Sequence, residues 1–211
     1  MYFKFRTNNK EFVEHLVFNF NDNLKVTGMS FSISDVAIND ILNKKKEWGT
    51  TQDKYQIISF VENYKTAYCF KRLEYIEKIF DDDALIIVGR RLENAPKSEN
   101  KDFVYLFDNE QVEYIRKTKE DYLKSLNLVF SSNEYVNIHF EENEIKRTNK
   151  DDKIYGIQIA QYYTSTNYSD KGYLFLMVDL NDSLNPKIYV RTWQPQKNPD
   201  GSIIGLQDFH F

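Results

Sequence analysis

The chain has 211 residues, of which 41% are hydrophobic and 28% are charged, a balance typical of a globular domain with or without an appendage. The formal net charge is −4, so we expect no nucleic-acid partner. The one cysteine, Cys69, excludes an internal disulfide framework and a cysteine-based zinc site.

No apolar run reaches the length of a transmembrane segment, and the charged first residues lack the apolar centre of a signal peptide. We therefore expect a soluble chain. Its compartment is not fixed by the sequence, and a segment of a longer exported protein of the bacterial periplasm or envelope stays open as an alternative.

Residues 1–50 are expected to form a β appendage. Alternating residues predict a hairpin with strands at 13–20 and 24–33, because turn residues separate them at 21–23. Ser34 or Asp35 is a candidate N-cap of a short helix that ends near Lys45. This region could be the remnant of a preceding β-rich region.

Residues 51–211 are expected to form the main domain. Apolar residues at helical spacing predict a strong helix from Asp53 and a second helical segment over 72–80. The apolar run 84–88 suits a strand buried on both faces. Further elements follow in the order turn, strand, helix and four strands, at 95–101, 103–107, 118–130, 135–147, 154–163, 173–180 and 187–194.

The last predicted strand has two different faces. Alternation places one set of residues together, Ile188, Val190, Thr192 and Gln194, and the other set opposite, Tyr189, Arg191 and Trp193. Arg191 beside Trp193 could bind an anionic or aromatic ligand. Alternatively, Arg191 stacks on a ring at the outer surface of the sheet. The sequence leaves open which face of this strand is concave. Because the last strands are apolar on both faces, we expect a second subunit or the N-terminal hairpin to cover the outer face.

The order of these elements, together with the stretch FVENYKTAYCFKRLEYIEKIFDDDALIIVG at 60–89, resembles the NTF2-like superfamily, which includes ketosteroid isomerase-like and SnoaL-like proteins. The resemblance covers roughly 53–195. It implies an α+β cone in which a curved mixed β-sheet wraps around about three helices and encloses a cavity. Residues 64–68, 173–176 and 191–195 make the chain look closest to the C-terminal region of uncharacterised bacterial members.

The resemblance does not carry ketosteroid isomerase chemistry to this chain. Aligned without gaps at residues 82–84, the chain has Tyr64 where that family has its oxyanion-binding tyrosine. However, Val88 stands where the family has its carboxylate base, and a valine cannot abstract a proton. The second oxyanion acid would fall near Leu174, in a stretch without acids.

Five residues are candidates for lining the cavity of such a cone: Tyr64, Tyr68, Gln161, Arg191 and Trp193. A phenol buried at Tyr64 needs a hydrogen-bond partner, which is either structural or a ligand. We assign no catalytic residue and expect no cofactor. We also expect no metal, because the three histidines are far apart and residues 81–83 lack the spacing of a calcium loop.

The functional hypothesis is a non-catalytic binding or interaction module. Its partner would be a small apolar or aromatic ligand in the cavity, or a second copy or another domain on the outer sheet face. One alternative is an enzyme of unassigned chemistry, which requires Tyr64, Gln161 and Arg191 to converge in one cavity. Another is a structural segment of a larger bacterial envelope protein.

Overall fold

The computed structural model describes residues 1–43, 48–91, 112–148 and 152–209. Within these ranges the α-helices are α1 (Asp35–Leu42), α2 (Thr51–Cys69), α3 (Leu73–Ile79) and α4 (Lys119–Ser132). The strands are β1 (Tyr2–Lys4), β2 (Glu11–Val13), β3 (Leu16–Phe20), β4 (Val26–Phe31), β5 (Phe80–Arg91), β6 (Val112–Lys117), β7 (Val136–Arg147), β8 (Ile154–Ser165), β9 (Ser169–Asp179) and β10 (Lys187–Gln194). The predicted turn at 95–101 and strand at 103–107 lie outside the described residues.

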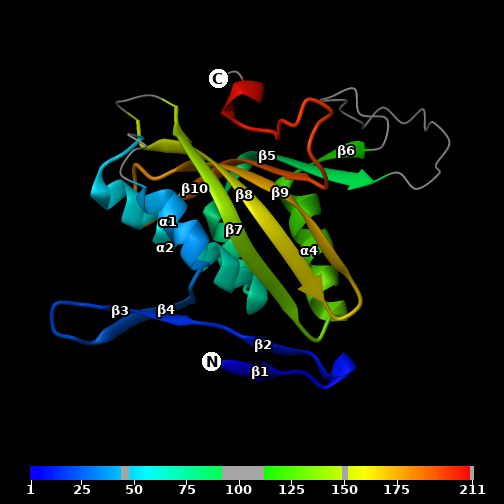
Figure 1. Ribbon diagram of the computed structural model, residues 1–211, viewed down its shortest axis with the longest axis horizontal. Coiled ribbons are helices and arrows are strands. Elements are labelled where there is room, and N and C mark those ends of the chain that lie inside the picture. The colour runs from blue at the N-terminus through cyan, green and yellow to red at the C-terminus, as the bar shows by residue number, and fades with distance from the viewer. Residues whose placement is uncertain (44–47, 92–111, 149–151, 210–211) are drawn as a thin grey trace.

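The predicted α+β cone is confirmed. A six-stranded sheet in the order β6-β5-β10-β9-β8-β7 curves around the helices, with β10 parallel to β5 and all other pairs antiparallel (Figure 1). The main core lies between the concave face of this sheet and the helices. In the part of the chain that the structure describes, no helix is both long and apolar enough to cross a membrane.

The two helices that open the cone start at capped residues. Ser34 Oγ accepts a hydrogen bond from Ala37 N at 3.1 Å, which fixes the start of α1. Thr50 and Asp53 form a capping box at the start of α2, because each side chain accepts a hydrogen bond from the other residue's backbone amide. Helix α1 ends at Leu42, earlier than the predicted end near Lys45, which lies outside the described residues.

A β-bulge interrupts the simple alternation of β10. Ile188 pairs with Val178 and Val190 pairs with Met177, so Tyr189 is an extra residue in the strand. Ile188 therefore packs in the inner core, whereas Val190 and Tyr189 pack on the outer face. The prediction that Ile188 shares a face with Val190, and Tyr189 with Arg191, is wrong, because strict alternation does not allow for a bulged residue.

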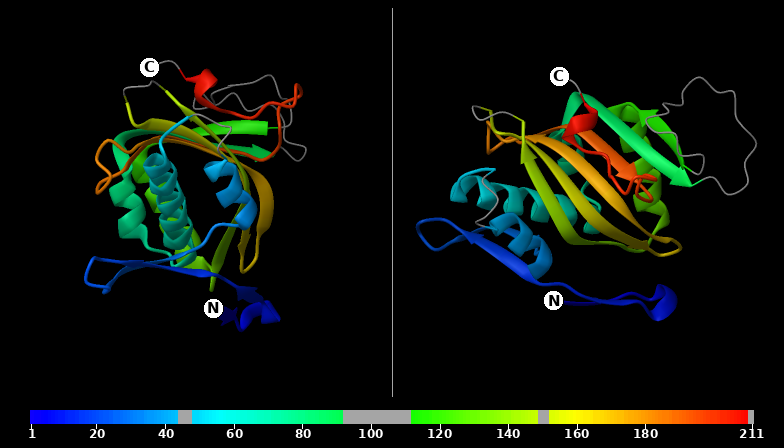
Figure 2. Two further views of the ribbon diagram at one scale, coloured as in Figure 1. Left: turned by 60° about the vertical axis from the view of Figure 1, so that its left-hand side comes forward. Right: turned by 45° about the horizontal axis from the view of Figure 1, so that its top comes forward.

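The outer face of the sheet is covered, as expected, but the cover is the chain's own C-terminal segment (Figure 1). Ile204 is buried there, and its backbone N–H donates to Gln194 Oε1 at 2.9 Å. The ring of Phe209 stacks on that of Phe175 with centroids 5.5 Å apart. The N-terminal strands, predicted as one possible cover, lie instead on the helix side of the molecule (Figure 2).

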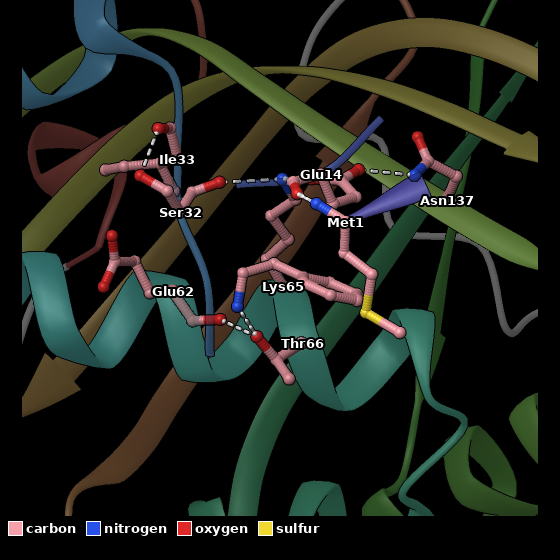
Figure 3. Close-up of polar contacts among 9 residues, drawn as sticks. Met1, Glu14, Ser32, Ile33, Glu62, Lys65, Thr66 and Asn137 are labelled. Carbon is pink, nitrogen blue, oxygen red and sulfur yellow. Dashed lines mark hydrogen bonds and ion pairs between the residues drawn. The ribbon is translucent and has the colours of Figure 1, made fainter. Parts of the chain in front are cut away.

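The predicted hairpin, β3 paired with β4, is confirmed, and a buried ion pair ties its surroundings to the cone. Lys65 Nζ of α2 lies 2.6 Å from Glu14 Oε2 and also donates to Ser32 O at 2.8 Å (Figure 3). The other carboxylate oxygen of Glu14 accepts a hydrogen bond from Asn137 Nδ2 of β7 at 2.7 Å. One carboxylate therefore joins the N-terminal strands to both α2 and the sheet.

We predict that Lys65→Met lowers the free energy of unfolding by about 3–5 kcal/mol, because it leaves the carboxylate of Glu14 buried without its cation. Denaturant unfolding followed by circular dichroism measures this change. The double variant Glu14→Gln/Lys65→Met should lose less, since the amide of Gln still accepts from Asn137.

The exposed ion pair of Lys124 with Glu120 provides the control, and Lys124→Met should leave the free energy of unfolding unchanged within error. A Lys65→Met variant as stable as this control would show that the Glu14–Lys65 pair does not hold the N-terminal strands to the cone.

Candidate functional site

A cavity of about 480 Å³ lies inside the cone, walled by α2, α4 and the concave face of the sheet. All five side chains predicted for the cavity line it: Tyr64 and Tyr68 from α2, Gln161 from β8, and Arg191 and Trp193 from β10. Three elements far apart in sequence thus bring these residues together. Whether they bind a ligand stays a prediction.

The mouth and the floor of the cavity differ in character. Exposed residues at one end, Ser132, Asn167 and Tyr168, place the mouth between the end of α4 and the turn that joins β8 to β9. Buried residues of the wall lie deeper, and they include Arg191 and Tyr64. The cavity is therefore open to solvent at the tip of the hairpin and closed near the middle of the sheet.

The floor is a hydrogen-bonded network of three tyrosines and one arginine. Arg191 Nε donates to Tyr64 Oη at 3.3 Å, and Tyr64 Oη donates to Tyr68 Oη at 3.1 Å. The hydroxyls of Tyr68 and Tyr122 share a short hydrogen bond, and the Arg191 guanidinium lies over the Tyr122 ring, 5.0 Å from its centroid. Tyr64 thus has structural hydrogen-bond partners and still lines the cavity.

The tyrosines do not neutralise the guanidinium. Burial raises the pKa of Tyr68 well above its ordinary value, and burial also raises the pKa of Tyr122. Both hydroxyls therefore keep their protons at neutral pH, while an arginine stays protonated in any protein environment. The floor carries a full positive charge that is moderated only by hydroxyl dipoles and a ring face.

No described carboxylate pairs with Arg191. Its Nη1 nitrogen is buried and has no hydrogen-bond partner among the described residues. Asp170 also lines the cavity, but it lies six positions along β9 from Leu176, the residue that pairs with Arg191. That separation is roughly 20 Å along the strand. Asp170 instead accepts a hydrogen bond from Tyr168 Oη at 2.7 Å, near the mouth.

A second cation faces the same cavity. Arg191 pairs with Ile86, and Ile86 pairs with Lys117, so the three residues lie in one row across the concave face. Two strand spacings place Lys117 roughly 10 Å from Arg191 at the backbone. Lys117 Nζ donates to Ser125 Oγ of α4 at 2.9 Å. The inner part of the cavity therefore carries two positive charges.

One glycine shapes the wall beside these cations. A Cβ at Gly172 would lie 2.7 Å from Cζ2 of Trp193 and 2.6 Å from the backbone oxygen of Gln194. Only glycine therefore lets the indole lie this close to β9. Gln161, which is buried, pairs with Gly172 across the strands and also lines the cavity.

The site has no assembled metal centre or isomerase base in the described residues. No group of three or more His, Cys, Asp or Glu residues there could hold a metal ion. Val88, aligned with the base of the ketosteroid isomerases, does line the cavity, so an aliphatic side chain stands where that chemistry needs a carboxylate.

Lys117, Tyr122 and Tyr163 are among the cavity residues that sequence reasoning did not name as site candidates. Tyr122 lies on the apolar face predicted for the third helix, and Tyr163 alternates in phase with Gln161 along β8. These two signals were present in the sequence. Lys117 gave none, because no strand was predicted over 112–117, where the structure has β6.

Comparisons with known proteins bear on the fold. No protein-family model matches the sequence, and no curated protein matches it. Among solved structures, naphthalene 1,2-dioxygenase with indole bound in its active site matches with a TM-score of 0.50 at 8% identity, over 72% of this chain and 82% of that one.

Two further structures are similar at slightly lower scores. An NTF2-like protein of unknown function from Pseudomonas putida KT2440 has a TM-score of 0.49 at 8% identity, over 74% of this chain and 95% of that one. Bd1075 from Bdellovibrio bacteriovorus has a TM-score of 0.49 at 16% identity, over 69% of this chain but only 41% of that one. The chain thus spans less than half the length of Bd1075. The order of helices and strands and the sheet topology show that the protein has the NTF2-like fold.

Proposed function

We propose that the protein is a non-catalytic binding module that holds one small molecule, with an apolar or aromatic body, in the cavity of the cone. The observation that carries this proposal is the cavity of about 480 Å³ with the five predicted side chains in its wall. Cavities of roughly 300–1,000 Å³ with mostly apolar walls and a few convergent polar groups are typical of ligand sites.

The chemistry of the wall fits this role. Aliphatic side chains reach the cavity from both layers of the fold, and among them are Leu126 and Val129 of α4 and Ile138 of β7. Trp193 and Tyr163 add ring faces. The buried polar groups of the floor, Arg191 and the tyrosine hydroxyls, can orient a ligand in the cavity.

The protonation and hydrogen bonding of the polar side chains in the cavity support a role without catalysis. Tyr68 and Tyr122 have raised pKa values, so both hydroxyls stay protonated at neutral pH and neither supplies a general base. The carboxylate of Asp170 lies near the mouth, hydrogen-bonded to Tyr168. An enzyme of unassigned chemistry is the second candidate, because Tyr64, Gln161 and Arg191 converge in one cavity, as that reading requires.

A docking function on the outer sheet face, with a second copy or another domain, has less support. The C-terminal segment already occupies the centre of that face, with Ile204 buried against the sheet. The division of the chain at residue 50, and its membership in a larger envelope protein, are separate proposals on which the cavity does not depend.

We predict that the uncharged probe N-phenyl-1-naphthylamine binds the protein at one saturable site, with a rise in fluorescence. Val129→Trp should weaken this binding by about tenfold or more, because an indole would fill space that the probe needs. Titration of the probe into each folded variant measures the dissociation constants.

Leu128→Trp is the matched control, because Leu128 directly precedes Val129 in α4 and its side chain is exposed to solvent. This variant should bind the probe as the unmodified protein does. Absence of saturable binding, or equal effects of the two tryptophans, would contradict the proposed function.

A further inference from the structure

We propose that the molecule held in the cavity carries an anionic group, in the simplest case a carboxylate, that binds the guanidinium of Arg191. The ligand class is therefore an aromatic or alicyclic carboxylate. This inference rests on the proposed binding function and adds the charge and the orientation of the ligand.

The first support is the unused hydrogen-bonding capacity of Arg191. The residue is 8% exposed, and its Nη1 is buried without a partner among the described residues. Its Nε is already engaged by Tyr64 Oη at 3.3 Å, which holds the plane of the guanidinium in place. A fixed planar fork with a free donor is the arrangement that binds carboxylates best.

The second support is the distribution of charge along the cavity. Arg191 and Lys117 lie in one row of the concave face, while Asp170, the carboxylate of the wall, lies near the mouth. The potential therefore becomes more positive towards the floor. An anion that enters between α4 and the turn from β8 to β9 is drawn inward, whereas a cation is not.

The third support concerns the rest of the ligand. An inorganic anion would fill only a small part of a cavity of about 480 Å³. Trp193, held close to β9 by Gly172, offers a ring face beside the guanidinium. The amide of Gln161, a buried residue of the cavity wall, offers one further polar contact. These features fit a ring system attached to the carboxylate.

The test compares two probes of similar shape, 2-naphthoate and the uncharged 2-acetylnaphthalene, by isothermal titration calorimetry with the full chain. We expect 2-naphthoate to bind the unmodified protein about tenfold or more tightly, because a hydrogen bond to a charged group contributes that much. Arg191→Met should reduce the ratio of the two affinities to about one.

Arg116→Met is the matched control, because it removes one positive charge from an exposed residue of β6 beside Lys117. It should keep the preference for 2-naphthoate. Equal binding of both probes to the unmodified protein, or a preference that survives Arg191→Met, would overturn the anion proposal and leave the proposed binding function intact. Binding of neither probe would overturn both.

Arg191 also has an expected effect on stability without ligand. Because its charge is buried and has no described carboxylate partner, we predict that Arg191→Met has a melting temperature equal to or above that of the unmodified protein. Addition of 2-naphthoate should raise the melting temperature of the unmodified protein by more than that of the variant, because the variant binds this probe more weakly. A clear fall in melting temperature of the ligand-free variant would contradict this account, because Arg191 would then stabilise the fold.

Discussion

The guanidinium of Arg191 is buried in the cone without a described carboxylate beside it, and the arrangement of the cavity follows from that constraint. A buried charge costs several kcal/mol unless polar groups compensate for it. Here the compensation is partial: one hydrogen bond to Tyr64 and the ring face of Tyr122. Arg191 also lines a cavity open to solvent, where a ligand can supply a further polar contact to the guanidinium.

The same molecule shows how a buried cation is treated when it is structural. Lys65, which is even more deeply buried, has the carboxylate of Glu14 at 2.6 Å and the carbonyl of Ser32 at 2.8 Å. That pair joins the N-terminal strands to α2. The contrast between Lys65 and Arg191 separates a stabilising cation from one that is available for binding.

Much of this arrangement could be predicted from the sequence. Periodicity located the helices and the four last strands, and alternation along β10 placed Arg191 and Trp193 on one face. The bulge at Tyr189 could not be predicted, because an extra residue in a strand has no signature in hydrophobic alternation. This bulge matters for the core, because it places the side chain of Ile188 on the inner face of the sheet together with that of Arg191.

The segment that covers the outer face of the sheet could not be predicted from the sequence either. The segment that ends with Ile204 and Phe209 has no regular periodicity, so its docking depends on contacts that only the folded sheet creates. Because this segment shields one face of the sheet, ligand contacts are concentrated on the other. The cavity residues from α2 could be predicted for a different reason: a long amphipathic helix has one apolar stripe, and Tyr64 and Tyr68 lie on it.

The most direct measurement is a crystal structure of the protein with 2-naphthoate bound. We expect the ring to lie in the cavity beside Trp193, with a carboxylate oxygen about 3 Å from a terminal nitrogen of the Arg191 guanidinium. A naphthoate whose carboxylate points to the mouth, away from Arg191, or a cavity that holds only water at saturating probe, would contradict it.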